Sequence, residues 1–279
     1  INTNDNTLSL HDALPIYSET HKMLSKTYPY TILITEDDDE VRCFLERELS
    51  PHFKTRTAAN GKDALRVLEE EEISLVVSDV MMPEMNGFEL CRMIKSQLPF
   101  SHIPVILLTA LTDERQRIFG ITGGADDYIQ KPFHTDYVKI KIIHLLQERQ
   151  KLRERLLEKL RDNKLLLSEP EKVESIDDAF LRKFAEQIEA VYADPEYNVE
   201  KLSETLGLSR GHLHRKIKEL TGTAPVEFLR TYRLNKATQL LRQNAYTVSE
   251  VAYRTGFSSP AYFSKCFKAV YGVTPTEYQ

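Results

Sequence analysis

The chain has 279 residues, 41% of them hydrophobic and 28% charged, which is typical of a soluble globular protein with two or three domains. This composition excludes a collagen-like fibre and a membrane channel, and no apolar run approaches the ~20 residues that cross a bilayer. The net charge of −5 joins an acidic segment, −7 over residues 30–147, to a basic one, +6 over residues 197–279, which indicates a polyanionic partner.

The first 29 residues are polar and aperiodic, and we expect them to form a disordered leader. Within it, residues 7–16 (TLSLHDALPI) resemble one translated frame of a sequencing adapter. We interpret that stretch as an assembly artefact rather than an ordinary linker, and we expect the natural chain to begin further upstream. The three cysteines, Cys43, Cys91 and Cys266, have neither metal-ligand spacing nor a disulfide pattern, which favours a reducing cytoplasm.

Between residues 30 and 147, short apolar runs alternate with amphipathic segments. Five such βα units predict an α/β fold, a doubly wound five-stranded parallel sheet with helices on both faces. The expected strands are residues 31–35, 55–58, 74–78, 104–109 and 127–130. The expected helices are residues 38–49, 62–69, 87–97, 113–121 and 135–146.

The last of these helices is predicted to continue beyond residue 146, as far as Ser168-Glu169-Pro170. About three imperfect heptads follow, and they can form either a coiled coil that dimerises or a plain charged linker helix. We therefore assign residues 148–175 to a helical linker, with dimerisation there slightly favoured.

Polar residues follow several of the predicted strands. Glu36 and Asp37 follow the first strand and Asp79 the third, and the other polar groups are Thr109 and Lys131, which precedes Pro132. Because the carboxyl ends of parallel strands meet at one edge of a sheet, we expect these side chains to converge. Crowded carboxylates favour a hard cation such as Mg²⁺, and an ionised Asp79 can attack a phosphoryl group.

Residues 30–147 resemble a response-regulator receiver domain, a flavodoxin-like fold. The stretches that carry this resemblance are ILITEDD, SDVMMPEMNGFEL, LLTA and GADDYIQKPF. The resemblance implies that Asp79 is the phosphoacceptor, assisted by Thr109 and Lys131, and that Thr109 and Tyr128 form a switch pair. It implies a Mg²⁺ site made by Glu36, Asp37, Asp79 and the backbone carbonyl of Met81. A phosphatase with an aspartyl nucleophile is the runner-up, but it usually needs a second acid two residues after the nucleophile, where Met81 stands.

Residues 176–279 are helical in pattern and contain a duplication. Residues 199–209 match 248–258 at an offset of 49, while the tails of the two repeats match at an offset of 50. Each repeat predicts a helix, a turn at Gly207 or Gly256, and a second, recognition helix that begins at a capping serine, Ser209 or Ser258. The side chains expected to face inward are Leu213, Ile217 and Leu220 in the first recognition helix and Phe263, Phe267 and Val270 in the second.

Residues 198–279 resemble the AraC-type DNA-binding domain, most specifically in GFSSPAYFSKCFKAVYGVTPTEY. The resemblance makes residues 225–241 a connecting helix between two helix-turn-helix units, with an extra helix at 177–192. The resemblance places the family's base-reading positions on Gly211, His214 and Arg215 in the first repeat and on Pro260, Ala261 and Lys265 in the second. Gly211 has no side chain to contribute. The DNA-contacting residues that we expect are Arg210, His214, Arg215, Ser259, Ala261 and Lys265.

Together these features predict a transcription regulator of a two-component phosphorelay that binds specific DNA sequences when phosphorylated. Its expected partners are double-stranded DNA and a histidine kinase, with homodimerisation on phosphorylation and no membrane contact in this segment. The chain is expected to be a phosphoacceptor in the cytoplasm and not an enzyme, because it lacks a kinase's phosphorylatable helix and ATP lid.

Three alternatives remain from the sequence. The chain can be the cytoplasmic part of a hybrid sensor histidine kinase whose kinase half lies upstream. It can be a phosphate sink that does not bind DNA, although the basic segment with two recognition helices argues against this. It can be an AraC-type protein switched by a small ligand, although an acidic pocket stands where a sensing pocket is needed.

Overall fold

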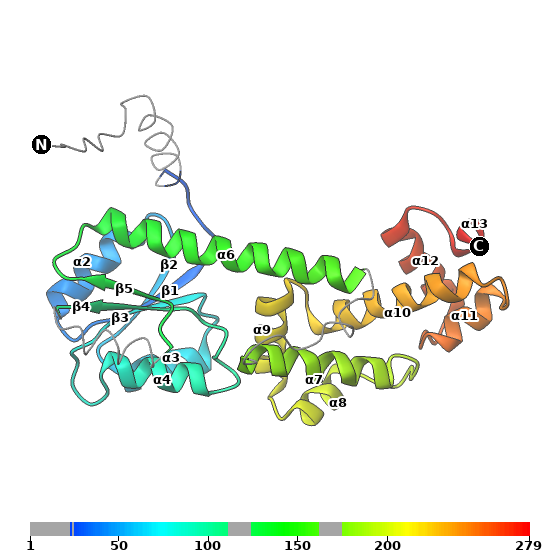
Figure 1. The fold of residues 1–279 in the computed structure, drawn as a ribbon, viewed down its shortest axis with the longest axis horizontal. Helices are drawn as coiled ribbons and strands as arrows, with labels where there is room; N and C mark the ends of the chain where they lie inside the picture. Colours follow the sequence, from blue (N-terminus) through cyan, green and yellow to red (C-terminus); the bar gives the residue numbers. More distant parts are fainter. Residues whose placement is uncertain (1–22, 24, 111–123, 162–174) are drawn as a thin grey trace, which may run out of the picture. The chain divides into compact units, whose positions relative to one another are not determined.

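A computed structural model describes residues 23, 25–110, 124–161 and 175–279, with the backbone alone for 155–161 (Figure 1). These residues form two compact units that divide between Arg149 and Gln150. The finer division of the chain into leader, linker and two domains stays a prediction. Among the helices that the structure describes, none combines the length and apolarity of a membrane span.

The first unit is built on a five-stranded, wholly parallel sheet with the strand order β2-β1-β3-β4-β5. Its strands are β1 (Thr31–Thr35), β2 (Lys54–Ala58), β3 (Leu75–Asp79), β4 (Val105–Thr109) and β5 (Asp127–Gln130). The chain reverses its winding direction between β1 and β3, which confirms the doubly wound fold. A ligand site in such a sheet is expected beyond the carboxyl ends of the strands at this switch point.

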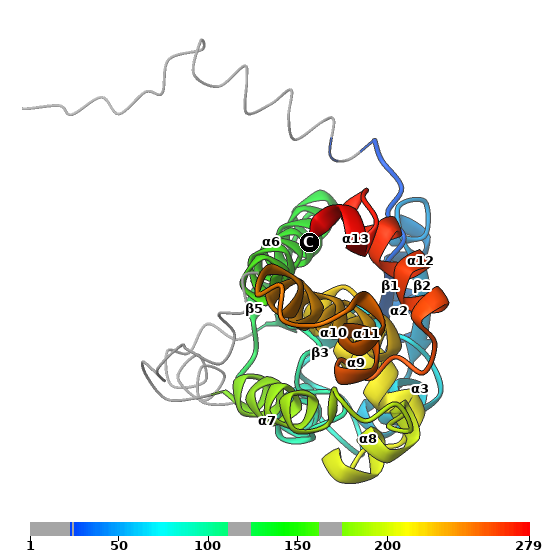
Figure 2. The same ribbon diagram turned by 90° about the vertical axis from the view of Figure 1, so that its right-hand side faces the viewer.

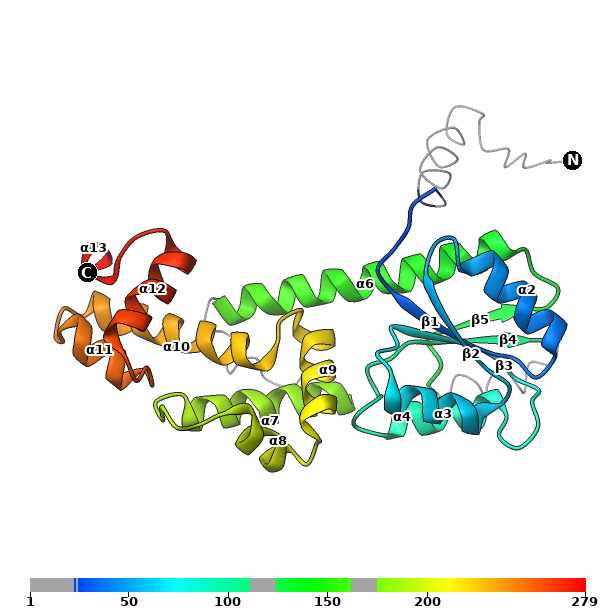
Figure 3. The same cartoon turned by 180° about the vertical axis from the view of Figure 1, so that it is seen from behind.

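Helices cover both faces of the sheet, as Figure 3 shows. They are α2 (Asp39–Leu49), α3 (Gly61–Glu70), α4 (Gly87–Ser96) and α6 (Thr135–Arg161). Ile32 and Ile34 of β1 face a core shared with α2 and α6, whereas Leu33 faces a second core shared with α3 and α4. Burial on both faces explains why the inner strands β1, β3 and β4 contain uninterrupted apolar runs, whereas the edge strands β2 and β5 are more polar and more exposed. The helix predicted at 113–121, and the predicted continuation of the last helix from residue 162 to residue 168, lie outside the described residues.

The described residues of the second unit contain helices and no strand (Figure 2). After the end of α6, which falls in this unit, further helices follow. They are α7 (Ile176–Val191), α8 (Val199–Leu206), α9 (Arg210–Thr221), α10 (Pro225–Arg242), α11 (Val248–Arg254), α12 (Pro260–Tyr271) and α13 (Pro275–Tyr278). The pairs α8–α9 and α11–α12 are the two predicted helix-turn-helix units, joined by α10. Gly207 and Gly256 have φ angles of 69° and 78°, so both predicted left-handed turns are confirmed.

The structure corrects two details of the second helix-turn-helix unit. The N-cap of α12 is Ser259 and not Ser258, because the hydroxyl of Ser259 accepts the backbone N–H of Tyr262. The stretch from the turn glycine to the N-cap is therefore one residue longer before α12 (Gly256 to Ser259) than before α9 (Gly207 to Ser209), and the two recognition helices correspond at an offset of 50. Val270 is 47% exposed instead of buried, because the inner stripe continues from Phe267 at i+4 to Tyr271, whose ring lies 4.6 Å from that of Phe267.

The connection between β3 and α4 brings Gly87 against the backbone of Asp79. The amide of Gly87 donates to the carbonyl of Val80 at 3.0 Å. A Cβ atom at position 87 would lie 2.2 Å from the carbonyl oxygen of Asp79. Only glycine fits this approach, so Gly87 determines how closely the first turn of α4 packs against the end of β3.

Substituting Gly87 by alanine should therefore lower the free energy of unfolding of the first unit by roughly 1–3 kcal/mol, because backbone has to move. Gly211→Ala is the matched control, since a Cβ atom added at Gly211 in α9 would meet no atom within 4 Å beyond the neighbouring backbone of its own helix. This control should stabilise the second unit by roughly 0.5–1 kcal/mol. Urea unfolding of the full chain measures both, and a Gly87→Ala protein as stable as wild type would contradict the packing argument.

Candidate functional site

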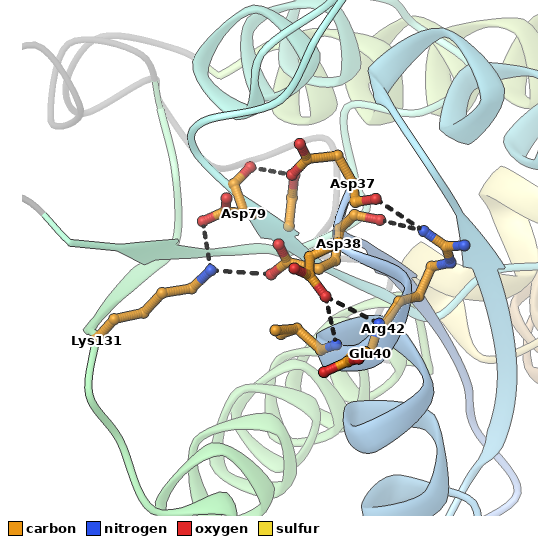
Figure 4. A network of polar contacts seen from close by, with 9 residues as sticks. Asp37, Asp38, Glu40, Arg42, Asp79 and Lys131 are labelled. Atoms are coloured by element: carbon orange, nitrogen blue, oxygen red, sulfur yellow. Dashed lines mark hydrogen bonds and ion pairs between the residues drawn. The ribbon is translucent and has the colours of Figure 1, made fainter.

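Three carboxylates meet at the edge of the sheet where β1 and β3 end (Figure 4). Oxygen atoms of Glu36, Asp37 and Asp79 all lie within 4.8 Å of one another. Glu36 and Asp79 are buried, whereas Asp37 is exposed. The parallel register produces this convergence, because Thr35 pairs with Ser78 and the next residue of each strand ends at the same edge. The three acids therefore converge as the sequence predicts.

Lys131 extends from the residue after β5 into this cluster. Its Nζ lies 2.9 Å from Oε2 of Glu36 and 2.9 Å from Oδ1 of Asp79. Figure 4 shows Lys131 pointing toward Asp79. Burial raises the pKa of Glu36, and the hydrogen bond from Lys131 only partly opposes it. Burial lowers the pKa of Lys131, but its hydrogen bonds to Asp79 and Glu36 outweigh burial, so the pKa is raised. The ammonium of Lys131 therefore forms ion pairs with two buried carboxylates.

Arg42 organises the loop that carries the acids, and sequence reasoning missed it. One of its terminal nitrogens donates to the carbonyl oxygens of Glu36 at 2.8 Å and Asp37 at 3.4 Å. The guanidinium also pairs with Asp39, while Asp38 caps the same helix by accepting the N–H groups of the residues two and three positions on. The available signal was an arginine one turn after the acids, on a helix that begins at them.

Of the other predicted residues, Thr109 lies half-buried at the end of β4, beside Gln130 in the register of β5. Tyr128 packs its ring against the core under α3 and α4. Its hydroxyl is buried without a hydrogen-bond partner among the described residues, and burial raises the pKa of Tyr128 to about 12. Met81 follows β3, and its side chain is 66% exposed. The peptide bond between Lys131 and Pro132 is cis.

The second candidate site is the outer surface of the two recognition helices. Arg210, His214, Ala261 and Lys265 are exposed, whereas Arg215 and Ser259 are half-buried. Arg210 pairs with Glu200 at 2.9 Å. Leu213 and Ile217 are fully buried as predicted, whereas Leu220 is only partly buried. Sequence reasoning missed Lys216, which belongs to the same basic helix but is fully buried.

The crowding of acids predicts that Asp37→Asn stabilises the metal-free first unit at pH 7, because it removes one of three mutually repelling charges. The gain should shrink toward pH 4, because Glu36 then carries less negative charge in both proteins. Burial raises the pKa of Glu36, so its ionisation destabilises wild type as pH rises through that pKa. Urea unfolding at both pH values measures the effect.

The control for this prediction is Asp38→Asn in the same loop. Asparagine caps a helix as well as aspartate does, and Asp38 is not one of the three converging acids. This variant should therefore change stability less. An Asp37→Asn protein that is no more stable than wild type at pH 7 would show that repulsion does not dominate the site.

Comparisons with known proteins divide the chain in the same way as its geometry. Residues 32–143 match the family of response regulator receiver domains, and residues 202–279 match a helix-turn-helix domain family. A histidine kinase of Formosa agariphila, Histidine kinase P4, is 37% identical over 270 residues, which cover 96% of this chain and 19% of that protein.

Other matches cover the first unit. The transcriptional regulatory protein GltR of Pseudomonas aeruginosa is 43% identical over 121 residues, or 43% of this chain and 50% of that protein. The solved receiver domain of a signal transduction histidine kinase from Syntrophus aciditrophicus is 38% identical, covers 43% of this chain and 91% of that one, and has a TM-score of 0.41. The matched part of this chain thus spans about a fifth of the length of Histidine kinase P4 and half of the length of GltR. Residues 32–143 are a response regulator receiver domain, and residues 202–279 are a helix-turn-helix domain of the AraC type on the same chain.

Proposed function

We propose that this chain is a two-component transcription regulator that accepts a phosphoryl group at Asp79 and binds specific DNA sequences through its second unit. The observation that carries the proposal is the convergence of Glu36, Asp37, Asp79 and Lys131 at one sheet edge, on a chain that also carries two helix-turn-helix units. The receiver and helix-turn-helix matches support this function, as does the match of the first unit to a named transcriptional regulator. In this role the chain is a phosphoacceptor, and the donor is a histidine kinase.

In the chemical step, a carboxylate oxygen of Asp79 attacks the phosphorus of a phosphohistidine. The new oxygen–phosphorus bond forms as the phosphorus–nitrogen bond breaks, and the imidazole leaves. Lys131 already contacts Asp79 and can pair with the added negative charge. The hydroxyl of Thr109 can donate to a phosphoryl oxygen.

The donor set fits Mg²⁺, which takes hard oxygen ligands, because three carboxylates lie within 4.8 Å and one ammonium balances only part of their charge. Glu36, Asp37, Asp79 and the carbonyl of Met81 would hold it. When bound, Mg²⁺ offsets the charge of the carboxylates and of the phosphoryl oxygens. Asp79, which Lys131 contacts at 2.9 Å, is the carboxylate of this set that would act as the nucleophile.

The proposed switch uses Thr109 and Tyr128. A phosphoryl group on Asp79 would draw Thr109 inward, and Tyr128 would follow into the space behind it. This proposal is supported by the buried hydroxyl of Tyr128, which has no hydrogen-bond partner among the described residues. Homodimerisation on phosphorylation is expected through residues 112–130, of which 112–123 lie outside the described residues.

For DNA binding we propose that α9 and α12 enter successive segments of the major groove, about 34 Å apart. Arg215 and Lys265 stand at corresponding positions of the two helices and are the first candidates for base contacts. Arg210, His214, Ser259 and Ala261 complete the proposed surface. The hydroxyl of Ser259 already caps α12, so its contribution would come from the helix N-terminus, which favours phosphate oxygens.

The phosphoacceptor assignment predicts that acetyl phosphate with Mg²⁺ adds one phosphoryl group that is stable in acid and labile in base. Asp79→Asn should abolish the label, because an amide is not a nucleophile of this kind. Asp38→Asn is the matched control and should label normally. Intact-mass spectrometry measures the adduct, and a label that persists in the Asp79→Asn protein excludes Asp79 as the acceptor.

The base-readout assignment predicts that Arg215→Ala relaxes sequence preference at one position of the bound site. An arginine paired with guanine O6 and N7 contributes ~1–3 kcal/mol of discrimination. Lys218→Ala, which removes an exposed lysine of the same helix, should instead weaken all sequences alike. Selection from a random DNA pool separates the two outcomes. If Arg215→Ala returns the wild-type motif with uniformly lower affinity, Arg215 contacts phosphate.

A further inference from the structure

Helix α9 carries a lysine that does not reach its surface. Lys216 is 0% exposed, although Arg210, His214 and Lys218 of the same helix are exposed. Its Nζ lies 2.6 Å from Oδ1 of Asp177, in the first turn of α7, 39 residues away in the sequence. The ammonium of Lys216 is therefore directed into the domain, away from the surface proposed to bind DNA.

Helix α7 supplies two of the groups around this ammonium. Besides Asp177, the ring of Phe180 lies 5.1 Å from Nζ of Lys216, at a distance and position that suit a cation–π contact. Phe180 is itself buried, and it lies one turn after Asp177 on α7. Helix α7 thus offers a carboxylate and an aromatic face to one side chain of α9.

The second repeat shows that burial at this position does not require a charge. At the offset of 50 set by the two N-caps, Lys216 corresponds to Cys266, which is buried and apolar. A buried ion pair is on average no more stabilising than a well-packed apolar contact. The charge at 216 therefore calls for an explanation other than stability.

The explanation that we favour is that a hydrogen bond, unlike an apolar contact, fixes the rotation of α9. Leu213 and Ile217 hold α9 by apolar contacts, which tolerate small rotations and slides because the hydrophobic effect has no preferred direction. The bond from Lys216 to Asp177 is lost when Nζ moves by about an ångström, since hydrogen bonds are short and angle-dependent. Arg215 precedes Lys216 in the helix, so fixing the rotation of α9 at 216 also fixes the direction of Arg215.

We propose that Lys216 is a positioning residue: through Asp177 it anchors the rotation of α9 on α7 and so aims Arg215 and His214. It does not itself contact DNA. This inference rests on the proposed DNA-binding function and adds the element that orients one of the two recognition helices. It also makes α7 part of the machinery of the first recognition helix.

The test is selection from a random DNA pool with the full-length chain, followed by affinity measurements at several salt concentrations. Lys216→Met keeps the length of the side chain and removes its charge. The base preference of the half-site read by α9 should fall about tenfold, while the half-site read by α12 is retained. The slope of log affinity against log salt should stay at its wild-type value, because no phosphate contact is lost.

Three further variants complete the test. Lys265→Ala should affect the other half-site and so identifies which half belongs to α12. Lys218→Met is the matched control on α9, and it should keep the wild-type motif while the salt slope falls by about one. Asp177→Asn should reproduce the loss seen with Lys216→Met, and it decides the matter by itself if Lys216→Met does not fold by circular dichroism.

A Lys216→Met protein that keeps the wild-type motif with a reduced salt slope would make Lys216 a phosphate contact and overturn the proposal. Unchanged motif and slope in Lys216→Met, or in Asp177→Asn, would overturn it as well, because burial alone would then explain the residue. Failure of the proposed function is distinguishable, since in that case the wild-type chain itself selects no motif.

Discussion

Electrostatic repulsion among carboxylates at one sheet edge is the constraint on which the first unit depends. A parallel sheet delivers the ends of β1 and β3 to the same place, so Glu36, Asp37 and Asp79 cannot avoid one another. Lys131 reduces the cost by contacting two of them. The negative charge that Lys131 does not balance is unfavourable for folding. The same charge would attract the proposed Mg²⁺ ion and supply the proposed nucleophile.

The surrounding residues hold this unfavourable arrangement in place. Arg42 binds the carbonyl groups of the acidic loop, and Asp38 caps the helix that begins there. On the other side, Gly87 lets α4 approach the backbone of Asp79. The cores on both faces of the sheet supply the stability that the charged edge loses.

The second unit also places a charge where an apolar residue would serve for packing. Lys216 of α9 and Asp177 of α7 form a directional contact beside the buried ring of Phe180. In both units a lysine contacts groups of another element: Lys131 contacts Glu36 and Asp79, and Lys216 contacts Asp177 and Phe180. We infer that geometry, more than stability, explains the choice of residue at these two positions.

All of the predicted strands and nearly all of the predicted helices in the described residues could be derived from the sequence, because apolar periodicity and capping are local. The acids at the ends of β1 and β3 could be derived too, since the parallel order alone brings them together. The cap at Ser259, the exposed Val270 and the roles of Arg42 and Lys216 depended on tertiary structure. A one-residue change in a turn, or the choice between two faces of a helix, is decided by what packs against it. The sequence by itself therefore determined the order of elements and the chemistry available, and packing decided which charged groups face each other across 39 or 95 residues of chain.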